Sequence, residues 1–477
     1  MLFVPQACGG GDDDDKSSGG STSSGGSSTS SGGSSKGGGA ATGGAKASGG
    51  TGTSSGGSAQ GGAAPEGGAV SEGGANPTSG GSVGATGGAG GAENGGETGT
   101  GGSATGGSGG QTASYKASAI AVGRLHSCAV TTTGAVLCWG SHDHGQVGNN
   151  VIHPTSASLA PVQVQGLTAG ATAISSFGDH TCAVVSGGVK CWGLNDQGQL
   201  GNGTQTESAV PVTVAGLTGV TAVAVGDQHS CALTSAGAVK CWGKNDYGQL
   251  GNDSTVEFST AAVDVTGLSS GVAAISAGFG HVCAVTTAGG MKCWGSNLYG
   301  EQGLGVAGNG AHKPGDVSGL TSGVAAIGLG EYVSCAGTTA GALKCWGRND
   351  SGQLGNGASG TQVQEPAPVA VSGVTAGATA VSSGYGFTCG VISGAAKCWG
   401  SNFYLVIGNG GSPSLVAETP VAVTGLGSGV VAIAATSSDH ACALTTAGAI
   451  KCWGSSGSLG HGTADDSATP VAVVGFP

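Results

Sequence analysis

Charged side chains are scarce in this chain of 477 residues, since Asp, Glu, Lys and Arg make up only 8% of it. Ordinary soluble domains contain roughly a quarter. The 14 Lys and Arg residues are outnumbered by 26 Asp and Glu, which gives a formal net charge of −12. A surface that binds nucleic acid or anionic lipid needs clustered Lys and Arg to neutralise phosphates. The composition therefore predicts no nucleic-acid partner, and contact with a membrane only through a covalent lipid anchor.

Long apolar runs and the motifs of common catalytic sites are also missing. No run of 18 apolar residues occurs, so the sequence predicts no membrane-spanning helix. There is no His-Glu-x-x-His and no phosphate-binding loop, and Asp and Glu are too scattered to nominate a pair of glycosidase carboxylates. We therefore expect no enzyme activity, no cofactor and no bound metal.

Residues 9–114 consist almost entirely of Gly, Ser, Ala and Thr, and their only large aliphatic residues are Val70 and Val83. Such a segment cannot bury enough apolar surface to offset the entropy lost when its backbone is ordered. We expect a disordered linker whose r.m.s. span is roughly 50–60 Å. It divides residues 1–8 from a globular part at 115–477.

The globular part repeats one unit seven times. The tripeptide Cys-Trp-Gly recurs at intervals of 50 to 54 residues, and a second cysteine precedes each copy by nine or ten positions. Within a unit, short stretches such as 222–225 and 229–233 are small or alternating, and Gly-rich turns such as 235–237 separate them. This pattern predicts short strands and hairpins. Seven units of about 50 residues, each near four strands, match the blades of a β-propeller.

The run 226–252, with its His-Ser-Cys-Ala-Leu, Val-Lys-Cys-Trp-Gly and Asn-Asp-Tyr-Gly-Gln-Leu-Gly segments, resembles the regulator of chromosome condensation repeat. The resemblance covers residues 115–477 and implies an all-β, seven-bladed propeller. We expect the final segment, Pro470–Phe476, to supply a strand that the first blade lacks, which would close the ring without a free edge.

Fourteen of the 15 cysteines form seven pairs, each predicted to lie on the facing strands of a hairpin. The pairs are Cys128 and Cys138, Cys182 and Cys191, Cys231 and Cys241, Cys283 and Cys293, Cys335 and Cys345, Cys389 and Cys398, and Cys442 and Cys452. We favour disulfides over metal ligation, because the spacing differs from that of zinc sites, and over seven pairs of reduced, buried thiols. Disulfides on this scale predict an extracytoplasmic protein.

The remaining cysteine, Cys8, follows the short apolar run Leu2–Ala7 and precedes the linker. This arrangement resembles a bacterial lipoprotein attachment site, so residues 1–8 are interpreted as the remnant of a lipoprotein signal, with lipidation at Cys8. The alternative is an ordinary free thiol in a disordered tail.

Trp and His recur at fixed positions in the unit. All seven Trp residues belong to the Cys-Trp-Gly tripeptides, and we expect them to pack between blades. Five histidines, at 126, 180, 229, 281 and 440, each precede a cysteine by two residues. Two units have Val333 and Phe387 there instead, so we favour buried histidines bonded to the backbone over a ring of metal ligands.

Aromatic residues other than Trp concentrate in repeats four to six, at positions that vary while the surrounding framework does not. Exposed aromatic clusters are typical of interface hot spots. The candidate partner-binding residues are Phe279, Tyr299, Tyr332, Tyr385, Phe403 and Tyr404. Phe387 and part of 403–407 could instead fill the core.

Three classes of function stay open. The first is a secreted or surface-tethered binding scaffold, expected to be monomeric, for an extracellular or cell-surface protein or a glycan. The resemblance supports a protein target, since the family includes a secreted bacterial propeller that inhibits β-lactamases. The second is a guanine nucleotide exchange factor for a small GTPase, which is the activity of the family's eukaryotic namesake. The third is an enzyme with a site in the central channel. We favour the first.

Overall fold

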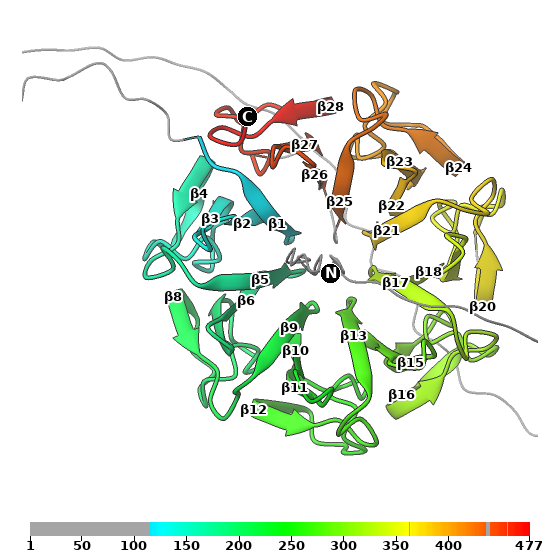
Figure 1. The fold of residues 1–477 in the computed structure, drawn as a ribbon, viewed down its shortest axis with the longest axis horizontal. Helices are drawn as coiled ribbons and strands as arrows, with labels where there is room; N and C mark the ends of the chain where they lie inside the picture. Colours follow the sequence, from blue (N-terminus) through cyan, green and yellow to red (C-terminus); the bar gives the residue numbers. More distant parts are fainter. Residues whose placement is uncertain (1–113, 362, 436–438, 456) are drawn as a thin grey trace, which may run out of the picture. The chain divides into compact units, whose positions relative to one another are not determined.

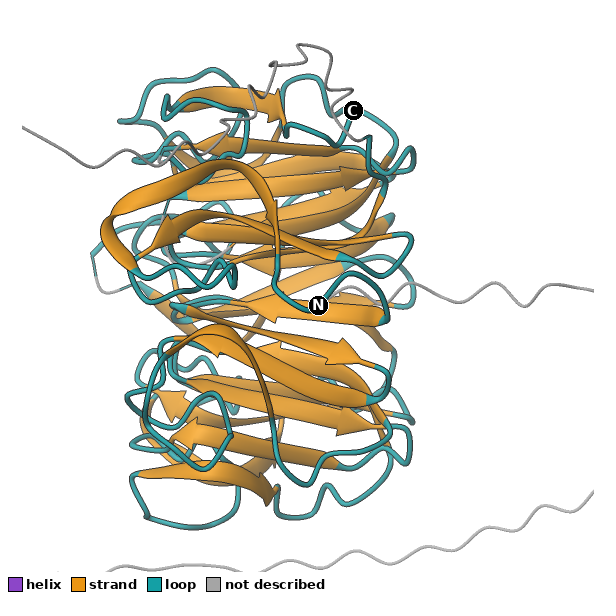
Figure 2. Cartoon of the chain, turned by 90° about the vertical axis from the view of Figure 1, so that its left-hand side faces the viewer, coloured by secondary structure: helices purple, strands orange, loops and turns teal. Residues whose placement is uncertain are grey.

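The computed structural model describes residues 114–477 except 362, 436–438 and 456. Within these residues, seven four-stranded antiparallel sheets are arranged as the blades of a ring (Figure 1). The predicted all-β, seven-bladed propeller is confirmed, and Figure 2 shows strands and loops but no helix in the described part. No helix there could therefore cross a membrane. Cys8 and residues 9–113 lie outside the described residues, so lipidation and the linker stay predictions.

Each blade uses four consecutive strands, which lie from the ring's centre outward. The innermost strands are β1 (Ala117–Val122), β5 (Ala171–Ser176), β9 (Val220–Val225), β13 (Val272–Ala277), β17 (Val324–Leu329), β21 (Ala378–Ser383) and β25 (Val430–Ala435). The second strands are β2 (His126–Thr131), β6 (His180–Val185), β10 (His229–Thr234), β14 (His281–Thr286), β18 (Val333–Thr338), β22 (Phe387–Ile392) and β26 (His440–Thr445). The third strands are β3 (Val136–His142), β7 (Gly188–Gly193), β11 (Val239–Lys244), β15 (Met291–Asn297), β19 (Leu343–Arg348), β23 (Ala395–Ser401) and β27 (Ile450–Gly454). The outermost strands are β4 (His153–Gln163), β8 (Ser208–Thr213), β12 (Phe258–Asp264), β16 (Gly308–Asp316), β20 (Gln364–Ala370), β24 (Val416–Ala422) and β28 (Ser467–Ala472).

The ring closes without a shared strand, so the predicted role of the final segment is wrong. Blade one already has four strands of its own, and β28 pairs with β27 inside blade seven. The seam is held by packing and hydrogen bonds instead. Phe476 packs against Trp139 and Tyr115, with ring centroids 6.4 and 5.7 Å apart, and the Trp139 indole N–H donates to the Ser458 carbonyl at 2.7 Å.

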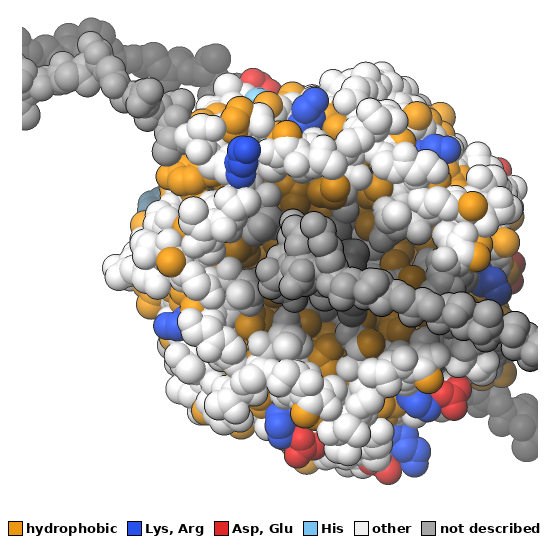
Figure 3. Space-filling view, in the orientation of Figure 1, with side chains coloured by type: hydrophobic (Ala, Val, Ile, Leu, Met, Phe, Trp, Pro, Cys, Tyr) orange, Lys and Arg blue, Asp and Glu red, His pale blue; other side chains and the backbone are white. Residues whose placement is uncertain are grey.

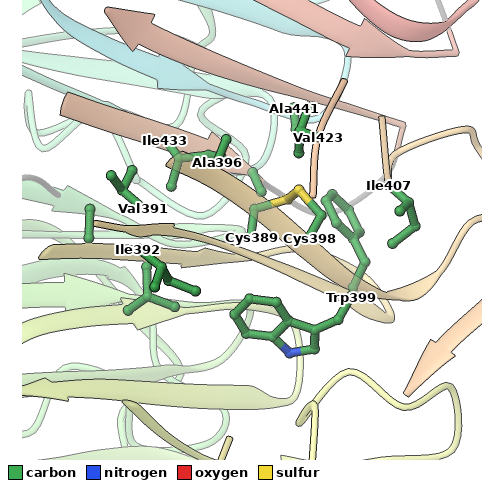
Figure 4. Close-up of a cluster of buried hydrophobic side chains, with 14 of the residues drawn as sticks. Cys389, Val391, Ile392, Ala396, Cys398, Trp399, Ile407, Val423, Ile433 and Ala441 are labelled. Atoms are coloured by element: carbon green, nitrogen blue, oxygen red, sulfur yellow. A yellow bond between two sulfur atoms is a disulfide. The ribbon is translucent and has the colours of Figure 1, made fainter. Parts of the chain in front are cut away.

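Disulfides and tryptophans build the core of every blade. The seven cysteine pairs join the second and third strands of their blades as the hairpin spacing predicts, with Cα atoms 4.0 to 4.1 Å apart. Figure 4 shows one example, in which Cys389–Cys398 lies beside Trp399 and the aliphatic residues of blade six. All seven Trp side chains are fully buried, and each indole N–H donates to a carbonyl of the preceding blade at 2.7 to 3.0 Å.

The five repeated histidines are buried, and four of them bond a hydroxyl of the following blade rather than the expected backbone group. The Nε2 atom of His180, for example, lies 2.8 Å from Ser230 Oγ. Since the Ser230 hydroxyl donates to the Gln199 carbonyl, the His180 ring N–H donates to Ser230. Among the described residues, no group of three His, Cys, Asp or Glu side chains comes together that could hold a metal ion.

The two ends of the ring differ. Loops joining first to second strands, and turns joining third to fourth strands, lie at one end, which we call the loop face. The opposite end, called the channel face, carries the hairpins between second and third strands and the connections between blades. A cavity of about 1420 Å³ lies along the axis between the innermost strands. Small aliphatic and hydroxyl side chains line it, and Lys116 is the one Lys, Arg, Asp, Glu or His among its described lining residues.

Candidate functional site

Arg348 is the centre of the aromatic cluster on the loop face. It is the last residue of β19, and its backbone N–H donates to the Tyr332 carbonyl at 2.9 Å. Its guanidinium carbon lies 5.3, 5.8 and 5.7 Å from the ring centroids of Tyr299, Tyr332 and Tyr385. These distances fall within the range of cation–π attraction. Three neighbouring blades therefore contribute a tyrosine to one cation.

A carboxylate fixes the orientation of Arg348. Asp350 accepts a hydrogen bond from Arg348 Nε at 2.8 Å and a second from Nη2. Both hydrogen bonds end on the same oxygen, Asp350 Oδ2, and together they restrict the orientation of the planar guanidinium. The arginine therefore presents a defined shape together with the tyrosines around it.

The aromatic rings of this cluster also contact one another. Tyr332 lies 4.9 Å from Tyr299 and 5.7 Å from Phe279, measured between ring centroids. Tyr385 is the most exposed of the four, at 44%, while Phe279, Tyr299 and Tyr332 are half-buried. We name Phe279, Tyr299, Tyr332, Arg348 and Tyr385 the aromatic–arginine cluster.

A buried carboxylate supports the position of Tyr299. Glu301 is fully buried and accepts hydrogen bonds from the Tyr299 backbone N–H at 2.7 Å and the Ser296 hydroxyl at 2.5 Å. Burial raises the pKa of Glu301, and these hydrogen bonds act in the opposite direction. Glutamine occupies the equivalent place in blades one, two, three and five and bonds the backbone in the same way.

Phe403 and Tyr404 form a separate pair. Their rings meet edge to face at 4.8 Å, and among the described residues no ring contact joins them to the aromatic–arginine cluster. Phe403 is 68% exposed, whereas Tyr404 packs against the core of blade six. Phe387 is fully buried, as the core alternative predicted. The six candidate residues thus divide into a cluster of four and a pair.

Ionisable groups lie next to the cluster. Burial raises the pKa of Glu331 to about 7, although the Tyr332 hydroxyl and Arg348 act to lower it. Burial also raises the pKa of Tyr332, and the charge of Glu331 adds to that shift. Glu331 therefore changes its charge near neutral pH, directly beside the tyrosines.

A second charged group lies nearer the axis. Arg124 of blade one donates to Asp227 of blade three at 2.7 Å and approaches Asp179 of blade two at 3.6 Å. Burial raises the pKa of both aspartates, and Arg124 works against that shift. These contacts join the loops of three blades.

Sequence reasoning missed Arg348, which organises the cluster. The residue directly after Cys-Trp-Gly varies among the seven units, since it is Ser in four of them and Leu194, Lys244 or Arg348 in the others. The aromatic candidates were positions that vary among repeats whose surrounding residues stay the same, and the position of Arg348 satisfies the same criterion.

Comparison with known proteins agrees with the architecture. A model described as "RCC1-like domain" matches residues 86–424, and one described as "Regulator of chromosome condensation (RCC1) repeat" matches residues 430–459. The structure of human WBSCR16 superposes with a TM-score of 0.61 at 23% identity, covering 71% of this chain and 94% of that one. Yeast RCC1 (Prp20), solved with Kap60, gives a TM-score of 0.57 at 22% identity, with 66% and 77% covered.

Curated relatives match over shorter stretches. The mouse secretion-regulating guanine nucleotide exchange factor is 35% identical over 106 residues, which is 19% of this chain and 23% of that protein. The human E3 ubiquitin-protein ligase HERC2 is 32% identical over 208 residues, which is 42% of this chain and 4% of that protein. The chain thus spans less than a quarter of these relatives' length. By its repeats, its blades and the match over 86–424, the chain belongs to the RCC1-like domain family.

Proposed function

We propose that this propeller is an extracytoplasmic binding module that recognises a protein through the aromatic–arginine cluster on its loop face. Tyrosine, phenylalanine and arginine are enriched in interface cores, and hot spots are enriched in tyrosine and arginine. The observation that carries the proposal is Arg348, held by Asp350 and surrounded by three tyrosines from three blades. A glycan is the other ligand that this surface could take.

The framework supports this function because it is rigid. Each blade contains one disulfide, and each Trp bonds the preceding blade. A rigid scaffold loses little conformational entropy when its loops bind. The disulfides also support an oxidising compartment. Attachment to a surface through Cys8 belongs to the same proposal, as does the absence of enzyme activity.

Nucleotide exchange on a small GTPase is the second candidate, favoured by the similarity to the mouse exchange factor. An assay for release of labelled GDP from small GTPases tests it directly. Counting thiols under native and reducing conditions tests the compartment, since a nuclear or cytosolic exchange factor would carry reduced cysteines.

The binding proposal is tested by Tyr385→Ala, because this side chain is exposed enough to be removed without opening the core. We expect an unchanged melting temperature and an affinity for the captured extracellular partner reduced by about 30-fold, the loss typical of a hot-spot aromatic. The matched control is Ile152→Ala, since Ile152 is 45% exposed on the loop face of blade one. Equal effects of the two substitutions on binding would contradict the proposal.

A further inference from the structure

The seven lysines of the channel face form a ring. Six of them precede the cysteine of a Cys-Trp-Gly tripeptide in blades two to seven, and they are Lys190, Lys240, Lys292, Lys344, Lys397 and Lys451. Lys116, just before β1, supplies the seventh. Its backbone carbonyl accepts a hydrogen bond from Thr132, which follows β2 of blade one, and it lies beside Gly448 in the hairpin of blade seven. On the face drawn in Figure 3, basic side chains are spaced around the ring and acidic ones are few.

The register of the strands places these lysines at one level. In each of the six blades, the lysine of the third strand lies opposite the last residue of the outermost strand, for example Lys344 opposite Ala370 and Lys451 opposite Ala472. Because every blade has the same pairing, the six positions share one depth below the channel face. Their half-buried side chains can lay the aliphatic part along the sheet and keep the ammonium group in water.

Acidic side chains are divided unequally between the two faces. Of the 18 Asp and Glu residues after position 114, only Asp264 and Asp316 lie at the channel face, where they pair with Lys240 and Lys292 at 2.6 Å. Seven lysines and two aspartates give this face a formal side-chain charge of +5. The loop face carries the other 16 acidic residues and four basic ones, and each of these four has an acidic partner.

We propose that the channel face docks on an anionic lipid bilayer through this lysine ring. A planar ring fits a planar surface, because all its members can approach together, whereas a linear polyanion would contact only an arc. Each lysine close to an anionic leaflet strengthens binding by about fivefold. The net charge of −12 argued against such contact, but it averages over two faces of opposite sign.

The path of the chain agrees with this orientation. Strand β1 begins on the channel face, so the residues before Lys116 join the propeller on the side that carries the ring. A bilayer on this side would leave the loop face, with the aromatic–arginine cluster, pointing away from the lipid. The docking proposal rests on the lysines alone and does not depend on the proposed protein partner.

Sedimentation with vesicles tests the proposal, using the full chain with Cys8→Ser so that no acyl chain contributes. We expect binding to vesicles of phosphatidylglycerol and phosphatidylcholine, little binding to phosphatidylcholine alone, and loss of binding as salt is added. The variant Lys344→Gln with Lys451→Gln should lower the partition coefficient roughly 25-fold. The matched control, Lys244→Gln with Lys313→Gln, removes the same charge from the loop face and should change it less than about twofold.

Three results would overturn the proposal: no preference for the anionic vesicles, equal losses in the two double variants, or stronger binding to heparin than to the vesicles. The last would assign the ring to linear polyanions. The melting temperature of each variant shows that it is folded, and neither double variant alters the aromatic–arginine cluster.

Discussion

At the scale of the residue, Leu405 shows what one substitution does to a repeated turn. In blades one to five the corresponding position is glycine with φ between 73° and 82°, as at Gly145 (74°), Gly300 (82°) and Gly352 (73°). Leu405 adopts φ 62° at the same place. A left-handed conformation costs a residue with a Cβ atom roughly 1–2 kcal/mol. At this turn, blade six therefore contains a local strain that blades one to five lack.

Replacing Leu405 by glycine should relieve this strain. The glycine also increases the entropy of the unfolded chain, which opposes the gain, so we expect a net stabilisation of about 0.5–1 kcal/mol. Denaturant unfolding of the non-reduced protein measures it. The reverse change, Gly352→Leu, should destabilise, because a Cβ there would lie 3.1 Å from Glu418 Cα. A loss of stability in Leu405→Gly would mean that the leucine side chain contributes more by packing than its backbone costs.

At the scale of the element, the second strands make the propeller sensitive to acid. Burial lowers the pKa of His126, His180, His229 and His281 to about 3, and that of His440 to about 4. In the unfolded chain these groups titrate near 6.5. Below that pH the unfolded state binds more protons, so stability is fully present above pH 6.5 and is lost as the pH falls toward 3. Each histidine contributes about 1.4 kcal/mol per pH unit.

His281→Phe tests this element, because Phe387 shows that blade six accepts phenylalanine at the same position. The slope of the unfolding free energy against pH should decrease by about 1.4 kcal/mol per unit between roughly pH 6 and 4. Ser334 keeps a partner in the variant, since its hydroxyl donates to the Glu301 carbonyl at 2.7 Å. An unchanged slope in His281→Phe would show that this histidine is charged in the folded protein.

The elements were largely predictable from the sequence, and the site only in part. The period of Cys-Trp-Gly and the hairpin spacing depend on local pattern, so they predicted the blades and the cysteine pairs. The cluster depends on contacts between different units, such as those of Arg348 with Tyr299 and Tyr385, which lie 49 residues before it and 37 residues after it in the sequence. A repeat pattern aligns equivalent positions, but it does not show which neighbouring loops meet. For that reason the sequence predicts a single set of six residues, although among the described residues no ring contact joins Phe403 and Tyr404 to the other four.

At the scale of the whole molecule, the seam between blades one and seven is closed by a shared hydrophobic cluster to which Phe476 belongs. Phe476 is fully buried there between Trp139 and Tyr115. Phe476→Ala should lower the unfolding free energy by about 3–5 kcal/mol, because it opens a cavity in the core. Hydrogen exchange should increase first in β1 and β25–β28, the strands that border the seam. An increase distributed equally over all seven blades would contradict a localised seam.

The closure without strand exchange has a consequence for how this ring could arise and change. Every blade is encoded by one uninterrupted stretch of chain, so the unit of gene duplication coincides with the unit of structure. In a propeller closed by a shared strand, one blade combines strands from both ends of the chain, so a duplication or deletion must leave that combined blade intact. Here a recombination event that copies one stretch of about 52 residues delivers a complete four-stranded sheet, already carrying its own disulfide. The loops at one end can then diverge blade by blade while the inherited frame stays the same.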